Sequence, residues 1–221
     1  DYVRKDVLKD QKHTVFYAGG SGSFRRIDDI ENHDSTQRGF DMTMDMPIPL
    51  RTGFIRDIEF DPEFDSVLYV GFSTRSQASR VWKVSDIYSQ EPVWESIGDD
   101  LPRFLPVNDL QFMSTKPYTL VAGTDYGLYT YSEGNWLREE QIPPVVIYQL
   151  KLRDTSEVYA FTHGRGIFKV DLKVDQMTSV ESQNKSDFVL YPNPIGAEQT
   201  VFWKTDQSVT EVQVYDMSGR L

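Results

Sequence analysis

The sequence predicts an all-β protein assembled from four-stranded antiparallel sheets, and two observations support this. First, residues 107–138 divide into four short strand-like segments separated by tight, glycine-containing turns. Leu110 and Phe112 alternate there with polar neighbours, which is the period of a half-buried strand. Second, similar segments recur at residues 17–19, 69–71, 121–123 and 159–161, so that Gly19, Gly71 and Gly123 lie 52 residues apart.

This recurrence is typical of a β-propeller, in which each blade is a four-stranded sheet of about 40–50 residues. One such sheet cannot bury both of its faces alone, so it requires neighbours like itself. We therefore expect residues 1–172 to form the C-terminal blades of a larger propeller. An unrelated β-sandwich with similar strands is the alternative.

In the first repeat, residues 15–20 and 23–27 are predicted to form a hairpin, followed by a polar surface loop over 27–39. We expect residues 40–46 to form an outer strand whose methionines pack against the next blade, although a soft binding surface is an alternative. Residues 1–14 are polar and charged, and we expect them to be an outer strand or loop of a preceding blade.

The later repeats are clearer. The second is predicted to have strands at residues 54–60, 67–73, 80–84 and 92–97. The third is the segment 107–138. The fourth has strands at residues 145–152, 157–162 and 167–172, and its outer strand is expected to be missing or weak.

After Leu172 the composition changes. Residues 173–187 are polar and aperiodic, as in a linker, and residues 188–221 resume with alternating strand segments. We expect 188–221 to be an incomplete second domain, because so few strands do not make a stable sandwich.

Charge and composition exclude several classes of function. The net charge is −11, with 34 acidic and 23 basic residues, which argues against nucleic acid and anionic lipid as partners. The chain has no cysteine, so disulfides and thiolate metal sites are excluded. No apolar run reaches the ~20 residues of a membrane helix. The chain begins with Asp1, and we expect its precursor to start upstream with a signal peptide.

The chain offers few residues with the spacing of a chemical site. The acidic residues at 61, 63 and 65 have an alternating spacing, but they lack the glycine and the distal Glu of a calcium loop, and a turn is the favoured interpretation. His163 and Arg165 are the only pair singled out as a ligand-site candidate, and a plain hairpin with Arg165 bonded to backbone carbonyls is the alternative.

The sequence shows neither a nucleophile elbow nor a phosphate loop. A glycosidase needs two carboxylates across a groove, and nothing selects two of the 34 acidic residues. We therefore predict no catalytic residue, no metal ligand and no cofactor for this chain. Whether it is an enzyme stays open, with a non-catalytic role favoured.

The repeats resemble the sialidase-type (BNR, Asp-box) repeats of sortilin-like Vps10 propellers and of some exported glycosidases. The resemblance is carried by FDPEFDSVLYVGF, LVAGTDYGLYTYSEGNW and VYAFTHGRGIFKV. Residues 162–167 match a strand end that is common in this family. The Asp-box is degenerate, since Ser132, Gly134 and Trp136 remain without its Asp or Thr. Propellers of the two-component-regulator type contain similar GTxxGLY motifs and remain an alternative.

Residues 188–221 resemble the start of a type A C-terminal sorting domain of the type IX secretion system of Bacteroidetes, which is an Ig-like β-sandwich. An ordinary fibronectin-like domain is the alternative, and the later strands of the sorting domain are absent. The residues that match its opening and its central turn are Tyr191, Pro192, Asn193, Pro194, Tyr215, Asp216, Gly219 and Arg220.

Together the resemblances imply a protein secreted from, or attached to the outer surface of, a Gram-negative bacterium. Type IX secretion components would recognise its C-terminal domain, and the propeller would bind a protein or a glycan as a non-catalytic scaffold. Two alternatives follow from the same resemblances: an exported, sialidase-like or other glycoside hydrolase with catalytic residues elsewhere, or a propeller subunit of the secretion or attachment machinery.

Overall fold

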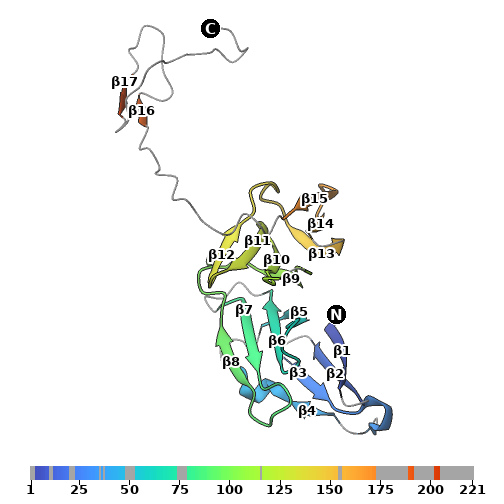
Figure 1. Ribbon diagram of the computed structural model, residues 1–221. Helices are drawn as coiled ribbons and strands as arrows, with labels where there is room; N and C mark the ends of the chain where they lie inside the picture. The colour runs from blue at the N-terminus through green and yellow to red at the C-terminus, as the bar shows by residue number, and fades with distance from the viewer. Residues whose placement is uncertain are drawn as a thin grey trace. The chain divides into compact units, whose positions relative to one another are not determined.

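The computed structural model (Figure 1) describes residues 3–9, 12–19, 23–34, 36, 38–47, 53–73, 79–114, 116–153, 156–172, 189–191 and 202–204. The chain divides into two compact units, Asp1–Val174 and Asp175–Leu221. The regular elements of the described residues are strands, apart from two short 3-10 helices. The predicted all-β class with four-stranded antiparallel sheets is therefore confirmed.

The first unit contains four antiparallel sheets, each with its strands in sequence order. The first sheet consists of β1 (Val3–Lys9), β2 (Lys12–Gly19), β3 (Ser23–Ile27) and β4 (Phe40–Asp41), with helices η1 (Ile30–Asn32) and η2 (Met42–Asp45) beside it. The second consists of β5 (Ile55–Phe60), β6 (Val67–Phe72), β7 (Val81–Ser85) and β8 (Val93–Ser96).

The third sheet consists of β9 (Val107–Phe112), β10 (Leu120–Thr124), β11 (Gly127–Ser132) and β12 (Asn135–Arg138). The fourth has three strands among the described residues: β13 (Ile147–Arg153), β14 (Glu157–Thr162) and β15 (Ile167–Asp171). In the second unit, β16 (Val189–Tyr191) pairs with β17 (Phe202–Lys204).

The third sheet follows the sequence closely because its turns are encoded locally. Gly127 and Gly134 have φ values of 98° and 83°, in a region that glycine adopts readily. Both lie at the hairpins that join β10 to β11 and β11 to β12. The four strands predicted within residues 107–138 are confirmed.

The first sheet corrects two predictions. Residues 3–9 form β1 and pair with β2, so they belong to the same sheet as the predicted hairpin of the first repeat and not to a preceding one. Residues 40–46 do not form one outer strand, because β4 stops after two residues. The Asp41 side chain accepts a hydrogen bond from Thr43 N at 3.0 Å, and this bond begins helix η2.

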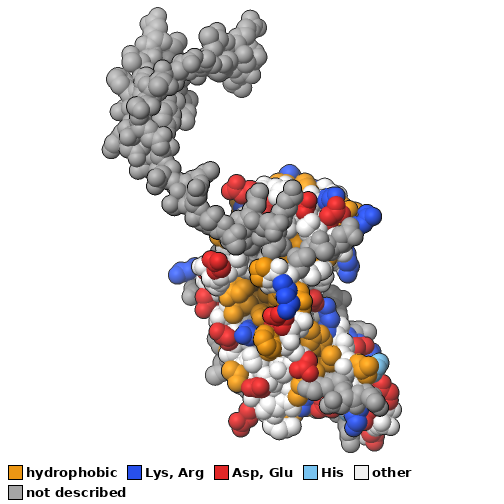
Figure 2. Space-filling view, in the orientation of Figure 1, with side chains coloured by type: hydrophobic (Ala, Val, Ile, Leu, Met, Phe, Trp, Pro, Cys, Tyr) orange, Lys and Arg blue, Asp and Glu red, His pale blue; other side chains and the backbone are white. Residues whose placement is uncertain are grey.

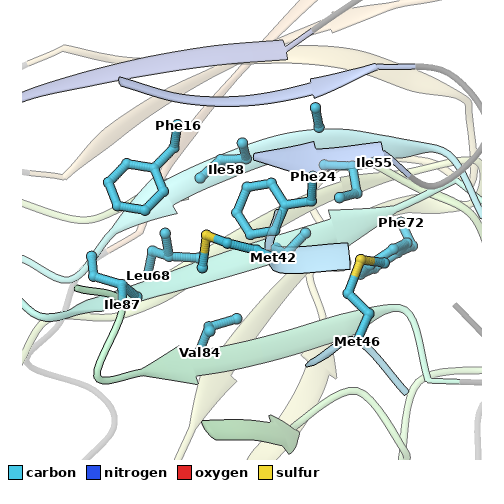
Figure 3. Packing of buried hydrophobic residues seen from close by; sticks show 12 residues of the cluster. Phe16, Phe24, Met42, Met46, Ile55, Ile58, Leu68, Phe72, Val84 and Ile87 are labelled. Atoms are coloured by element: carbon cyan, nitrogen blue, oxygen red, sulfur yellow. The ribbon is translucent and has the colours of Figure 1, made fainter. Parts of the chain in front are cut away.

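Two methionines that follow β4 pack as expected. Met42 and Met46 are fully buried among side chains of the first and second sheets. Figure 3 shows Met42 beside Phe24, with Leu68 and Val84 of the second sheet close to it. This apolar cluster joins the two sheets, because the facing apolar side chains of both sheets are removed from water when they pack together.

The first strands of the later sheets begin with a bulge. Register shifts separate Ile55 from Asp57, and Ile147 from Gln149, and a similar irregularity lies opposite residue 108 at Gly123 and Thr124. The extra residue reverses the side-chain alternation. Ile55 and Ile58 are therefore both buried, whereas strict alternation over residues 54–60 predicts opposite faces for them.

Neighbouring sheets are related in the same way at two successive interfaces. A Cβ atom placed on Gly71 would lie 3.1 Å from Val107 and 3.3 Å from Leu110. One placed on Gly123 would lie 2.8 Å from Ile147 and 3.3 Å from the Leu150 side chain. Each glycine thus lets the next sheet approach closely.

The first strands of successive sheets, β1, β5, β9 and β13, also lie beside one another in turn. In the first sheet, Ala18 packs in the same cluster as Ile55 and Ile58. A Cβ atom on Gly19, which aligns with Gly71 in the sequence repeat, would meet Ser23 at 3.9 Å, so Gly19 makes no equally close contact with the next sheet among the described residues. Three apolar clusters fill the three interfaces between the four sheets.

Candidate functional site

The starts of the first strands and the turns between second and third strands meet at one end of the sheets. A repeated backbone hydrogen bond marks this end in three sheets. The bonds join Ser73 N to Phe54 O (2.9 Å), Asp125 N to Pro106 O (3.2 Å) and His163 N to Val146 O (2.9 Å). Asn108 Nδ2 donates to Ile147 O at 3.0 Å, so the third and fourth sheets are also joined here.

Exposed aromatic and basic side chains gather at this end. We call the set the strand-start face, and it consists of Phe54, Arg56, Arg103, Phe104, Tyr126, Tyr148, His163 and Arg165. Its four aromatic residues other than His163 are 49–53% exposed. Within the part of the chain that the structure describes, its three arginines have neither a hydrogen bond nor an ion pair. Aromatic residues and arginine are the types enriched where proteins bind one another.

His163 and Arg165, the candidates from the sequence, lie in the exposed turn between β14 and β15. Thr162 closes the turn, since its N and Oγ1 donate to Gly166 O at 3.1 and 2.7 Å. The His163 ring stands edge-on to Tyr148, with centroids 5.5 Å apart. The segment is a hairpin turn between β14 and β15, and within the described residues Arg165 has no hydrogen bond to a backbone carbonyl.

A pocket of about 360 Å³ opens within the strand-start face, between the β8–β9 connection and the β10–β11 turn. Figure 2 shows hydrophobic side chains gathered between the positions of β8 and β12, with charged side chains beside them. The residues that line the pocket are Pro102, Arg103, Phe104, Leu105, Pro106, Asp125 and Tyr126. Its volume is within the range of sites that bind small ligands or a single peptide side chain.

Two of the lining side chains contact residues outside the lining, and a third lining residue has an unusual backbone conformation. The Arg138 guanidinium lies over the Tyr126 ring, 5.9 Å from its centroid. Asn108 Nδ2 donates to Asp125 Oδ1 at 3.0 Å. Phe104 has a φ of 61°, a left-handed backbone that is unfavourable for a bulky residue.

A second group of polar side chains lies along the first strands. Asp57 Oδ2 accepts from Leu110 N at 2.8 Å, and Asp109 Oδ2 accepts from Leu150 N at 2.6 Å. Lys5 Nζ forms an ion pair with Glu59 at 2.7 Å. Each aspartate thus joins its own sheet to the next one.

Burial raises the pKa of Asp57 to about 7, and the charge of Asp109 adds to the rise while Lys5 and the Leu110 N–H oppose it. Burial likewise raises the pKa of Asp109 to about 6, against the Leu150 N–H and the charge of Lys151. Raised carboxyl pKa values are found at catalytic sites and at structural sites alike. Here both carboxylates bond backbone N–H groups between sheets, which is a structural role.

The sequence contains a signal for these two aspartates in the spacing of its repeats. Asp57 and Asp109 are 52 residues apart, the same interval that separates Gly71 from Gly123. Each aspartate lies opposite its glycine across a strand pair. No comparable signal exists for Arg103 and Phe104, which lie in a connection that has no equivalent of the same length in each repeat.

The acidic residues at 61–65 form a turn, as predicted. Asp61 Oδ1 accepts from Glu63 N and Phe64 N, and its Oδ2 accepts from the Tyr69 hydroxyl. Glu63 forms an ion pair with Lys116. Among the residues that the structure describes, no group of three His, Asp or Glu side chains is placed to hold a metal ion.

Of the residues that carry the sorting resemblance, only Tyr191 belongs to the described part of the chain. The backbone of Tyr191 ends β16. Pro192, Asn193, Pro194, Tyr215, Asp216, Gly219 and Arg220 lie outside the described residues.

Comparison with known proteins does not add to this description. No protein-family model matches the chain, and no curated protein matches it. Within the described residues, no helix has the length and apolar character that crossing a bilayer requires.

Proposed function

We propose that this protein is a non-catalytic binding or scaffold module built on a β-propeller and exported by the type IX secretion system. The propeller part of the proposal is supported by the repeated relation between sheets. The same glycine contact and the same aspartate bond recur from the second sheet to the third and from the third to the fourth. Repetition of one relation is what a radial array of blades requires.

The observation that carries the binding role is the strand-start face. It exposes four aromatic rings and three arginines without partners among the described residues, and one end of the sheets presents all of them. A partner that covers the exposed rings gains apolar burial, and acceptor groups of that partner can offset the desolvation of the guanidinium groups. The opposite-end turn at 61–65, by contrast, uses its polar groups internally.

The export part rests on the resemblance of residues 188–221 to a sorting domain. Type IX components would be the partners of that domain, and the outer surface or the medium would be its destination. A protein held there needs no catalytic group of its own to act as an adhesive or scaffold. The two engaged aspartates, Asp57 and Asp109, are consistent with that role.

Site-specific photocrosslinking on the surface of a type IX-secreting bacterium tests the binding role. A photoreactive residue at Tyr148 of the full-length protein is expected to crosslink one partner. The same residue at Phe64, an exposed aromatic at the other end of β5, is the matched control and is expected to give none. Equal crosslinking from both positions, or no crosslink from either, would contradict a partner-binding strand-start face.

A further inference from the structure

The pocket beside Phe104 and Tyr126 has few polar groups to offer a ligand. Its charged groups are one guanidinium, Arg103, and one carboxylate, Asp125, and its remaining walls are mainly apolar. Two backbone carbonyls of the lining are already used: Leu105 N donates to Pro102 O and Asp125 N donates to Pro106 O, each at 3.2 Å. A ligand that buries many hydroxyl groups here would leave most of them unsatisfied, at a cost of about 1–3 kcal/mol each.

The apolar part of the lining is rich in rings. It includes the half-exposed aromatic rings of Phe104 and Tyr126 and the exposed Pro102, together with the buried Leu105 and Pro106. The Arg138 guanidinium lies over the Tyr126 ring, 5.9 Å from its centroid. Aromatic-lined pockets favour ligands that are themselves pre-ordered, because such ligands lose little conformational entropy on binding.

The charged groups of the pocket restrict the chemical class of the ligand further. The Arg103 guanidinium offers N–H donors and has no partner among the described residues, so it suits carbonyl oxygens. Asp125 in the lining and the net charge of −11 disfavour an anionic polymer. The ligand that fits is uncharged, apolar in its side chains, rich in carbonyl acceptors and poor in N–H donors.

We infer that this pocket binds a proline-rich peptide segment in the polyproline II conformation. Such a segment lacks N–H groups at its prolines, presents solvated carbonyls, and packs its rings against aromatic side chains. The Arg103 guanidinium donates to a peptide carbonyl, and a proline ring fills the space between Phe104 and Tyr126. The inference rests on the proposed binding function and names the chemistry of one partner.

Fluorescence anisotropy of the full chain with a labelled decaproline peptide tests this. A Kd of roughly 10–500 μM is expected. A labelled peptide of alternating glycine and serine is the control ligand, and a labelled neutral hexasaccharide is the competing class. Both are expected to bind at least about tenfold more weakly, since the first is not pre-ordered and the second carries hydroxyls that the pocket cannot satisfy.

Phe104→Gly is the decisive variant. It removes a ring of the pocket, and glycine favours the φ of 61° at this position, so the fold is retained. It is expected to raise the Kd for decaproline at least about tenfold. Tyr126→Phe, which keeps the ring, and Phe64→Ala, at the other end of the sheets, are expected to change it less than about threefold.

Three results would overturn the inference: no decaproline binding, tighter binding of the hexasaccharide, or decaproline binding that Phe104→Gly leaves unchanged. None of them decides the broader proposal, because crosslinking from Tyr148 reports on a partner of any chemistry. Conversely, if decaproline binds as expected but Tyr148 gives no crosslink, the peptide inference stands and the broader proposal of a partner on the strand-start face is contradicted.

Discussion

Asp57 in β5 accepts a hydrogen bond from the backbone N–H of Leu110 in β9, at 2.8 Å, so that one side chain joins the first strands of two sheets. Asp109 makes the equivalent bond to Leu150 in β13 at 2.6 Å. The two bonds repeat at the interval of the sequence repeat, and they connect neighbouring sheets where backbone pairing does not.

The burial of these aspartates predicts how stability depends on pH. Their pKa values are about 7 and about 6 in the folded protein, above the ordinary value of 3.8 in the unfolded chain. As the pH falls from 8 to 5, the native state binds protons that the unfolded state does not. The free energy of unfolding is therefore expected to rise by about 1–3 kcal/mol over this interval, and the gain levels off below pH 4.

Urea unfolding at pH 8 and pH 5 measures this rise. Asp57→Asn removes the charge and keeps an oxygen to accept the Leu110 N–H, so it is the matched variant. It is expected to be more stable than the wild type at pH 8 and to show a smaller pH dependence. An unchanged pH dependence in the variant would show that Asp57 titrates normally.

Close approach of the sheets predicts a steric limit at Gly123. A Cβ at this position would lie 2.8 Å from Ile147 Cγ2, closer than carbon atoms pack. Gly123→Ala is expected to lower the free energy of unfolding by about 1–3 kcal/mol. Gly71→Ala, whose nearest contact would be 3.1 Å, is expected to cost less, and thermal denaturation of the two variants checks the order. Equal costs, or a larger cost at Gly71, would mean that the closer contact at Gly123 does not determine the loss of stability.

The methionines after β4 predict a stability effect without an effect on binding. Met42 is fully buried between the first and second sheets, so Met42→Ala is expected to lower the free energy of unfolding by about 2–5 kcal/mol. Chemical denaturation measures the loss. At temperatures where the variant stays folded, decaproline binding is expected to be unchanged, because the pocket lies between the second and third sheets. A loss of binding in the folded variant would argue for coupling between the two regions.

The sorting resemblance predicts the fate of a truncated protein. Removal of residues 188–221 from the full-length protein is expected to leave it inside the cell envelope, because type IX components would no longer recognise it. Fractionation of cells and medium, followed by immunoblotting, measures the location. Export of the truncated protein at the wild-type level would remove the basis for the type IX assignment.

Much of the fold could be predicted because its signals are local. Alternation at Leu110 and Phe112 and the turn glycines Gly127 and Gly134 specify the third sheet without reference to the rest of the chain. The prediction of one outer strand over residues 40–46 is wrong because the choice between strand and 3-10 turn depends on one side-chain hydrogen bond, from Thr43 N to Asp41. The bulge at Arg56 likewise reverses the side-chain alternation along β5, whereas the apolar and polar residues of the sequence alternate there without interruption.

Less of the candidate site could be predicted. The position of His163 and Arg165 on a glycine turn follows from the sequence, whereas the contact of His163 with Tyr148 depends on two strands brought together by folding. Phe104 and Arg103 carry no pattern of their own. Their exposure and the left-handed backbone of Phe104 result from the way residues 102–106 cross between two sheets.

An experimental structure of the full-length protein tests most directly whether these sheets are propeller blades. The expected result places β1, β5, β9 and β13 as successive innermost strands around one axis, with the Asp57–Leu110 and Asp109–Leu150 bonds at equivalent places and a further sheet against the open face of the fourth. A structure in which the four sheets pair face to face as a sandwich, or in which β5 and β9 are not neighbours, would contradict the account.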